Sequence, residues 1–273
     1  MFINLILIKA QKQCHHLIWI YSIFRQKALI KLGIIQTSSY SSNEQGIEKV
    51  SNLLTQAGSK EADVICLPEQ WLAQNKIKDY NKVFERFRKI AKDYSLTIIP
   101  GAFYERESHG FTISAPVISS SGEIIGKQRK IHPFGYEKRL IKAGNSTDVF
   151  RTSCKFGIII CYDMVFAEVA RSLSLKGAEV LFSPSRIVKK GVYPWQLYVT
   201  VRALENRIPI LASNIENRKF GGKSVVIDLT ERDGIAIPKK IELHGQTARL
   251  VEFDLVRYKR IRKERFADLR KFS

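Results

Sequence analysis

The sequence predicts a mixed α/β domain built in layers. From Lys27 onward, short and continuously apolar segments alternate with segments of helical periodicity. Strands that are apolar on both faces belong to sheets that helices cover. A hairpin signal in the middle of the chain indicates that not every strand runs parallel. The 273 residues contain no long linker, repeat or low-complexity segment, so one domain is favoured over two.

The first half of the chain opens with a predicted strand at residues 29–36, which is apolar almost throughout. A polar turn rich in Ser and Asn then leads to a helix at 43–57, where apolar residues recur at helical spacing. A short apolar strand at 62–67 stops abruptly at a Pro-Glu pair. An amphipathic helix at 79–94 and a buried strand at 96–100 follow.

The second half begins with two predicted strands, 111–119 and 123–129, which Ser120-Ser121-Gly122 joins with the composition of a hairpin turn. Residues 155–161 form a continuous apolar strand, and a helix at 165–176 follows it. The remaining predicted elements are strands at 178–183, 208–213, 223–228 and 248–253 and a helix at 194–206.

The composition is that of an ordinary globular protein, 45% hydrophobic and 26% charged, which excludes disordered and collagen-like chains. The four cysteines (Cys14, Cys66, Cys154 and Cys161) show no CxxC spacing and no dense framework. We therefore expect free thiols in a reducing cytoplasm. None of the five histidines forms an HxxxH pair, so no histidine-built metal site is expected.

The formal net charge of +19 has two interpretations. One is attraction to nucleic acid, an anionic membrane or an anionic substrate. The other is a solvated surface rich in Lys and Arg, which we favour because basic residues are spread along the whole chain and are merely densest at 257–265. Zinc-ligand spacing and glycine-aromatic RNA-binding signatures are missing. We expect no specific nucleic-acid partner.

Residues 1–26 differ from the sequence that follows them. Their two short apolar runs fall below the ~20 residues that a membrane helix needs, and they lack the early positive residue and cleavage site of a signal peptide. We expect either a disordered extension or an artefact of a misassigned start codon, with a peripheral membrane anchor as the minor alternative. The domain is expected to span 27–273, including the C-terminal tail.

Three reactive side chains follow predicted strands at their carboxyl ends, where functional groups of α/β sheets gather. Cys161 precedes a helix whose amides would favour a thiolate and hold a developing oxyanion. Glu69 emerges from an apolar strand, where desolvation suits a general base. Lys130 ends the hairpin and can stabilise negative charge on a substrate oxygen.

Each of these residues also has a non-catalytic interpretation. Cys161 can be a small buried apolar residue, as most free cysteines are. Glu69 can be a loop glutamate, and Lys130 one of many basic side chains. His132 is expected to pack or to cap rather than to catalyse. Arg186, after Ser183-Pro184-Ser185, can pair with a substrate carboxylate or be a surface arginine.

In this order, the three segments resemble the nitrilase superfamily, the carbon–nitrogen hydrolases. Leu67-Pro68-Glu69 is similar to the family's glutamate motif, and residues 126–132 (Gly-Lys-Gln-Arg-Lys-Ile-His) to its lysine motif. Cys161-Tyr162-Asp163-Met164 is similar to its cysteine motif. Further similar segments extend the resemblance from about Leu29 to Arg270. The sequence departs from the residues usual in the family at Val165-Phe166-Ala167, Tyr193-Pro194-Trp195 and Gly222-Lys223-Ser224. These segments lie in regions that, in the family, shape the pocket or the subunit contact.

The resemblance implies a four-layer α-β-β-α sandwich of two mixed sheets covered by helices. It also implies a catalytic triad of Glu69, Lys130 and Cys161. The thiolate would attack the carbon of a small amide, nitrile or N-carbamoyl compound, and the resulting thioester would be hydrolysed to a carboxylic acid after ammonia has left. Glu137 and the Tyr162 backbone N–H are the further residues expected to orient the substrate.

The implied chemistry requires no metal or organic cofactor, and the resemblance implies a homodimer or a higher homo-oligomer. Because no segment is long and apolar enough to span a membrane, we expect no membrane partner. Two alternatives stay open. An acyltransferase would use the same thioester with an amine or thiol in place of water. A non-catalytic nucleic-acid-binding or scaffold protein would instead exploit the positive charge.

Overall fold

The computed structural model describes residues 29–108 and 110–270. The predicted extension at 1–26, which includes Cys14, lies outside the described residues. The alternatives given for this segment and the free thiol expected at Cys14 therefore stay predictions. In the described part of the chain, no helix combines the length and the apolar character that crossing a membrane requires.

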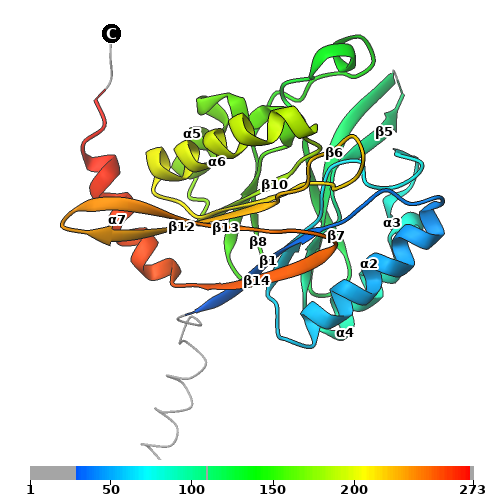
Figure 1. Ribbon diagram of the computed structural model, residues 1–273, viewed down its shortest axis with the longest axis horizontal. Helices are drawn as coiled ribbons and strands as arrows, with labels where there is room; N and C mark the ends of the chain where they lie inside the picture. Colours follow the sequence, from blue (N-terminus) through cyan, green and yellow to red (C-terminus); the bar gives the residue numbers. More distant parts are fainter. Residues whose placement is uncertain (1–28, 109, 271–273) are drawn as a thin grey trace, which may run out of the picture.

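Two mixed β-sheets lie face to face at the centre of the fold (Figure 1). The strands of the first sheet are β1 (Ile30–Gln36), β2 (Val64–Cys66), β3 (Lys76–Ile77), β4 (Thr97–Ile99), β5 (Phe103–Glu107), β6 (Gly110–Ile118), β7 (Ile124–Arg129) and β14 (Thr247–Phe253). Their order is β14-β1-β2-β4-β6-β5-β3, and β7 pairs with β6. β1, β2 and β4 run parallel, whereas β14 and the β6–β7 hairpin are antiparallel to their neighbours.

The second sheet is made of β8 (Val149–Arg151), β9 (Lys155–Ile158), β10 (Val180–Pro184), β11 (Ile210–Ser213), β12 (Val225–Arg232) and β13 (Ile235–Glu242). Its order is β13-β12-β11-β10-β9-β8. The three central strands β9, β10 and β11 are parallel, and antiparallel strands flank them on both sides.

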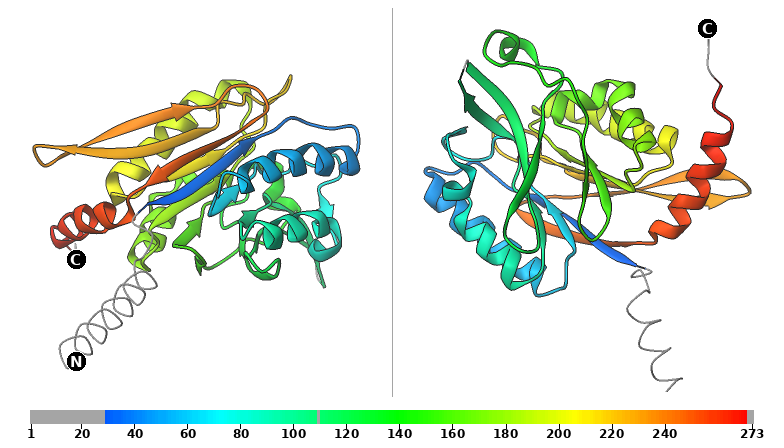
Figure 2. Two further views of the ribbon diagram at one scale, coloured as in Figure 1. Left: turned by 90° about the horizontal axis from the view of Figure 1, so that it is seen from below. Right: turned by 180° about the vertical axis from the view of Figure 1, so that it is seen from behind.

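Helices cover the outer face of each sheet. α2 (Asn43–Gly58) and α4 (Glu85–Asp93) lie on the first sheet, and α5 (Ala167–Leu175) and α6 (Val192–Asn206) lie on the second (Figure 1). The final helix, α7 (Leu255–Ala267), lies beside the projecting β12–β13 hairpin (Figure 2). This arrangement confirms the predicted four-layer α-β-β-α sandwich.

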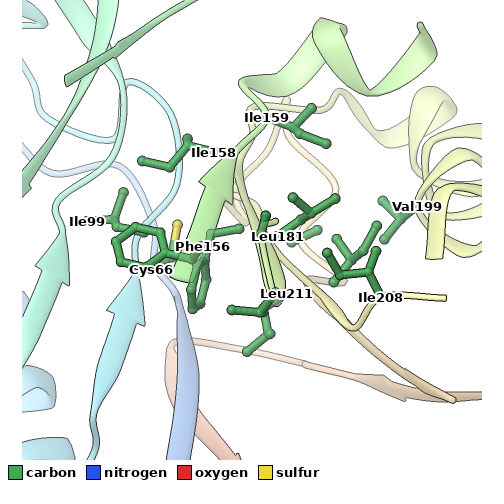
Figure 3. Packing of buried hydrophobic residues seen from close by; sticks show 14 of the residues in the cluster. Cys66, Ile99, Phe156, Ile158, Ile159, Leu181, Val199, Ile208 and Leu211 are labelled. Atoms are coloured by element: carbon green, nitrogen blue, oxygen red, sulfur yellow. The ribbon is translucent and has the colours of Figure 1, made fainter. Parts of the chain in front are cut away.

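The central strands of the first sheet, β1, β2 and β4, are buried on both faces because each face packs against another layer. In β2, Cys66 points into the cluster between the sheets, whereas Ile65 belongs to the cluster beneath α2. Figure 3 shows Cys66 and Ile99 beside Phe156 of the second sheet. Burying each such large apolar side chain contributes roughly 1.5–3 kcal/mol, so the layers hold the strand ends in fixed positions.

The helix predicted at 79–94 is interrupted. α3 (Tyr80–Val83) and α4 are separated at Phe84, whose backbone leaves the helical conformation with φ −107° and ψ 24°. The Phe84 ring is fully buried and lies 5.3 Å from the Phe87 ring and 5.5 Å from the Phe103 ring. Aromatic packing thus overrides the local preference for one continuous helix.

The chain after Cys161 also differs from the expectation. A 3-10 turn, Cys161–Val165, comes first, and α5 begins only at Ala167. Phe166 is extended, and its ring stacks on His132 with 3.7 Å between the ring centroids. The helix predicted at 165–176 therefore begins two residues later than expected, after the 3-10 turn that contains Cys161.

Candidate active site

A buried ammonium group lies between two carboxylates at one end of the first sheet. Lys130 Nζ is 2.9 Å from Glu69 Oε1 and 2.9 Å from Glu137 Oε2. The three residues are only 1%, 2% and 5% exposed, respectively. Because ionised groups are rarely buried without partners, this arrangement depends on the mutual pairing of all three side chains.

Hydrogen bonds to neighbouring strands fix the backbone at Glu69 and at Lys130. Glu69 comes after β2, and its N–H donates a hydrogen bond of 3.2 Å to the carbonyl oxygen of Ser185, just past β10 of the other sheet. Lys130 comes after β7, and its N–H donates to the carbonyl oxygen of Ile113 at 2.8 Å. Both side chains are thus positioned by rigid strands rather than by long loops.

Glu137 lies in a 3-10 turn, Gly135–Arg139. Its Oε2 atom accepts a hydrogen bond of 2.8 Å from the Phe134 backbone N–H in addition to its contact with Lys130. The two donors hold the carboxylate in one orientation. Glu137 is therefore a second carboxylate, besides Glu69, that fixes the ammonium of Lys130.

Cys161 follows β9 and is 9% exposed. Its φ of +48° is left-handed, a conformation that costs a non-glycine residue about 1–3 kcal/mol and occurs often at functional sites. Gln70, directly after Glu69, is also left-handed, with φ +50°. Sharp turns at Cys161 and directly after Glu69 therefore present these two side chains just beyond the ends of β9 and β2.

The thiol of Cys161 is close to the charged groups. Burial and the neighbouring Glu69 carboxylate raise the pKa of the Cys161 thiol above its ordinary value, whereas the Lys130 ammonium and a backbone hydrogen bond from Arg186 act in the opposite direction. The thiol is therefore protonated at neutral pH. Its deprotonation requires a base, and the Glu69 carboxylate hydrogen bonds to the same side chain.

Lys130 keeps its positive charge. Burial alone would lower the pKa of Lys130, but the negative charges of the Glu69 and Glu137 carboxylates outweigh it, so that the pKa lies above its ordinary value. An ammonium that stays charged can stabilise a developing oxyanion, but it is poorly suited to donate a proton.

Asp163 connects the two segments that carry Cys161 and Lys130. Its carboxylate accepts hydrogen bonds from the backbone N–H groups of His132 at 2.6 Å and Ile131 at 3.2 Å, and it lies 3.0 Å from His132 Nδ1. Burial raises the pKa of Asp163 to about 6, against the effect of these hydrogen bonds. His132 packs on Phe166, and its expected lack of a catalytic role stays a prediction.

The remaining predicted site residues border this centre. Tyr162 directly follows Cys161, and its ring contacts the Phe134 ring, with 4.9 Å between the centroids. The Arg186 backbone hydrogen bonds to the thiol, while its Nη2 donates to the hydroxyl of Tyr136 at 3.3 Å. The structure thus brings the predicted residues together, and their individual roles stay predictions.

Residues 31–236 match the family model of the carbon–nitrogen hydrolases. The chain belongs to the carbon–nitrogen hydrolase family. As a member of this family it is an enzyme that hydrolyses carbon–nitrogen bonds other than peptide bonds, which confirms the predicted family and enzyme class.

Individual members of the family share about a quarter of their residues with this carbon–nitrogen hydrolase. A citrullinase of Francisella tularensis is 28% identical over 213 residues, which cover 68% of this chain and 74% of that protein. An omega-amidase of Xenopus tropicalis is 27% identical over 206 residues, which cover 68% of this chain and 75% of that protein. A carbon–nitrogen hydrolase structure from Helicobacter pylori has a TM-score of 0.76 at 24% identity, over 90% and 97% of the two chains, and shares the fold.

Two parts of this carbon–nitrogen hydrolase site were not assigned a role from the sequence. Asp163 stood within the cysteine motif, and its acidic character next to a nucleophile was the available signal. Tyr136 directly precedes Glu137 and contacts Arg186. Sequence alone gives no signal for Tyr136, because its contact with Arg186 joins residues 50 positions apart.

Proposed function

We propose that this enzyme hydrolyses a small non-peptide amide, nitrile or N-carbamoyl compound through a thioester on Cys161, releasing ammonia and a carboxylic acid. The observation that carries the proposal is the buried Lys130 ammonium between Glu69 and Glu137, with the Cys161 thiol beside it. The similarity to an omega-amidase supports an amide substrate.

The first half of the reaction forms the thioester. Glu69 takes the proton of the Cys161 thiol while the sulfur attacks the amide carbon, and the Lys130 ammonium and the Tyr162 backbone N–H stabilise the negative charge on the substrate oxygen. The tetrahedral intermediate then collapses. The carbon–nitrogen bond breaks as Glu69 transfers the proton to the nitrogen, and ammonia leaves.

The second half regenerates the enzyme. Glu69 takes a proton from water, the oxygen attacks the thioester carbon, and the carbon–sulfur bond breaks. The acid leaves, and the proton returns from Glu69 to the sulfur of Cys161. Glu137 takes no proton in this scheme. It holds Lys130 in the orientation in which the ammonium contacts the developing oxyanion.

An ammonia-release screen over primary amides, nitriles and N-carbamoyl compounds tests the proposed activity. The wild-type enzyme should turn over at least one of these classes, and Cys161→Ala should abolish that turnover while the protein stays folded. Cys154→Ala provides the matched control, because Cys154 is another buried free thiol but lies outside the site. Full activity of Cys161→Ala would contradict the proposal.

Acyl transfer is the alternative that shares the thioester. Adding an amine such as hydroxylamine to the assay distinguishes the two reactions, because a transferase forms the hydroxamate in preference to the acid. A hydrolase should instead form mostly acid at low amine concentration.

We also propose that two copies associate through the outer face of α6. Tyr193, Leu197 and Val201 recur at a spacing of four residues on this helix, and all three are exposed. An apolar stripe at helical spacing is typical of a helix that packs against another surface. Light scattering should report a dimer, and Leu197→Glu should yield a monomer. A monomeric wild type would contradict this proposal.

A further inference from the structure

Arg186 connects the candidate nucleophile to a separate cationic group. Its backbone hydrogen bonds to the sulfur of Cys161, whereas its guanidinium extends to the hydroxyl of Tyr136, with 3.3 Å between Nη2 and the oxygen. The guanidinium also lies over the ring of Phe220, 5.1 Å from the centroid. A positive charge is therefore held one side-chain length from the reactive sulfur.

The charge of Arg186 is not neutralised by the part of the chain that the structure describes. No carboxylate in residues 29–108 or 110–270 lies within ion-pair distance of its guanidinium. The acidic side chains of the site are occupied elsewhere, since Glu69 and Glu137 both pair with Lys130. Arginine is the residue best suited to bind a planar carboxylate, because its N–H groups form a rigid fork.

Tyr136 supplies a second donor at the same place. Its oxygen accepts a hydrogen bond from the Tyr104 hydroxyl at 3.4 Å and another from Arg186 at 3.3 Å. A phenol oxygen has two acceptor positions and one proton. With both acceptor positions used, the Tyr136 proton remains available as a donor, and it has no acceptor among the described residues. Burial and the hydrogen bond to Tyr136 raise the pKa of Tyr104, so Tyr104 keeps the proton that it donates.

We propose that Arg186 and Tyr136 bind a carboxylate at the end of the substrate remote from the amide. The inference rests on the proposed function, since the substrate must also reach Cys161. It narrows the substrate to short acids that carry a terminal amide or carbamoyl group. The negative charge of Glu137 is close enough to raise the pKa of Tyr104, so it also repels an anion bound at Tyr136 and Arg186. A carboxylate with a single negative charge therefore suits the site better than a phosphate dianion.

A matched pair of amides tests this specificity. Glutaramate and pentanamide have the same chain length, but only glutaramate carries a carboxylate. The wild-type enzyme should prefer glutaramate in kcat/KM, and Arg186→Gln should lower that preference about 10- to 100-fold, as expected for loss of hydrogen bonds to a charged group. Arg186→Lys, which keeps the charge, should lie in between, and Tyr136→Phe should lower the preference by a smaller factor.

Arg86→Gln is the matched control, because Arg86 is an exposed arginine on α4, on the outer face of the first sheet, and this variant should leave the preference unchanged. An equal fall for both amides in Arg186→Gln would show a structural role instead and would overturn the inference. So would a wild type without any preference for glutaramate.

Binding to Cys161→Ala separates this inference from the proposed activity. Calorimetry should show that this variant binds glutaramate at least ten times more tightly than pentanamide, and that adding Arg186→Gln removes the difference. Selective binding without any turnover in the wild type would contradict the proposed function and leave the inference standing. Turnover with equal binding of the two amides, or no binding of either, would overturn the inference.

Discussion

The carboxylate of Asp163 accepts a hydrogen bond of 2.6 Å from the backbone N–H of His132. Asp163 lies two residues after Cys161, and His132 lies two residues after Lys130. The contact therefore joins the turn that presents the sulfur to the loop that presents the ammonium. The second hydrogen bond, from Ile131, makes the connection rigid. The distance between the reactive groups depends on a residue that performs no chemistry itself.

Replacing Asp163 by Asn should misplace Lys130 relative to Cys161. One backbone N–H would face an amide NH₂ instead of an oxygen, and a displacement of about 1 Å lowers rates by about 100-fold. We expect kcat to fall 10- to 100-fold with a smaller change in KM, measured by steady-state ammonia release. Asp233→Asn, at an exposed turn, is the control. Reduced stability with an unchanged kcat would show that Asp163 is only structural.

The stability conferred by Asp163 should depend on pH. Burial raises its pKa from 3.8 to about 6 in the folded protein. The folded state therefore favours the protonated form, so this contribution is fully present below pH 3.8 and is lost as the pH rises to about 6 and above. The unfolding free energy of the wild type, relative to Asp163→Asn, should fall by about 1 kcal/mol between pH 5 and pH 7. Urea denaturation measures it, and a rise would contradict the assignment.

Removing the ammonium of the buried ion cluster should destabilise the protein more than removing the charge of one carboxylate. Lys130→Met leaves the carboxylates of Glu69 and Glu137 buried without a counter-ion, which should cost about 3–5 kcal/mol. Glu137→Gln leaves the Glu69–Lys130 pair intact and should cost less. Adding Glu137→Gln to Lys130→Met should recover part of the loss. Denaturant midpoints check this series, and equal losses for the two single variants would argue against a coupled cluster.

The reactivity of Cys161 towards iodoacetamide should increase with pH. Because burial and Glu69 raise the pKa of the thiol, the thiolate fraction should grow about tenfold per pH unit from pH 7 to pH 9. Glu69→Gln removes the nearby negative charge and should speed alkylation at a given pH, although the same variant should lose turnover. Peptide mass spectrometry reports the labelling of Cys161. A plateau already at pH 7 would indicate a resident thiolate.

Strand positions and the order of the reactive residues were predictable because both are local properties of the sequence. The apolar segment that became β1 ends at Gln36 as expected, and β2 delivers Glu69 directly after Leu67-Pro68. The packing of the two sheets is not local. That packing places Ser185, just past β10, at the backbone of Glu69.

Other features needed either tertiary contacts or a signal that was overlooked. The break at Phe84 arises from ring packing with Phe103, which no helical periodicity can reveal. The β12–β13 hairpin, by contrast, turns through Asp233-Gly234, with φ values of +52° and +75°. An Asp-Gly pair is a strong hairpin signal, so β13 could have been predicted. The pairing of Lys130 with two carboxylates depended on the fold, since Glu69 lies 61 residues earlier.

Intact-mass spectrometry during turnover tests the central claim most directly. The enzyme is quenched in acid while it hydrolyses an amide that the ammonia screen has identified, and the protein and its peptides are weighed. We expect a mass increase equal to the acyl group, located on the peptide that contains Cys161, and no such adduct in Cys161→Ala or on Cys66. Turnover without any acyl adduct, or an adduct that persists in Cys161→Ala, would contradict the account.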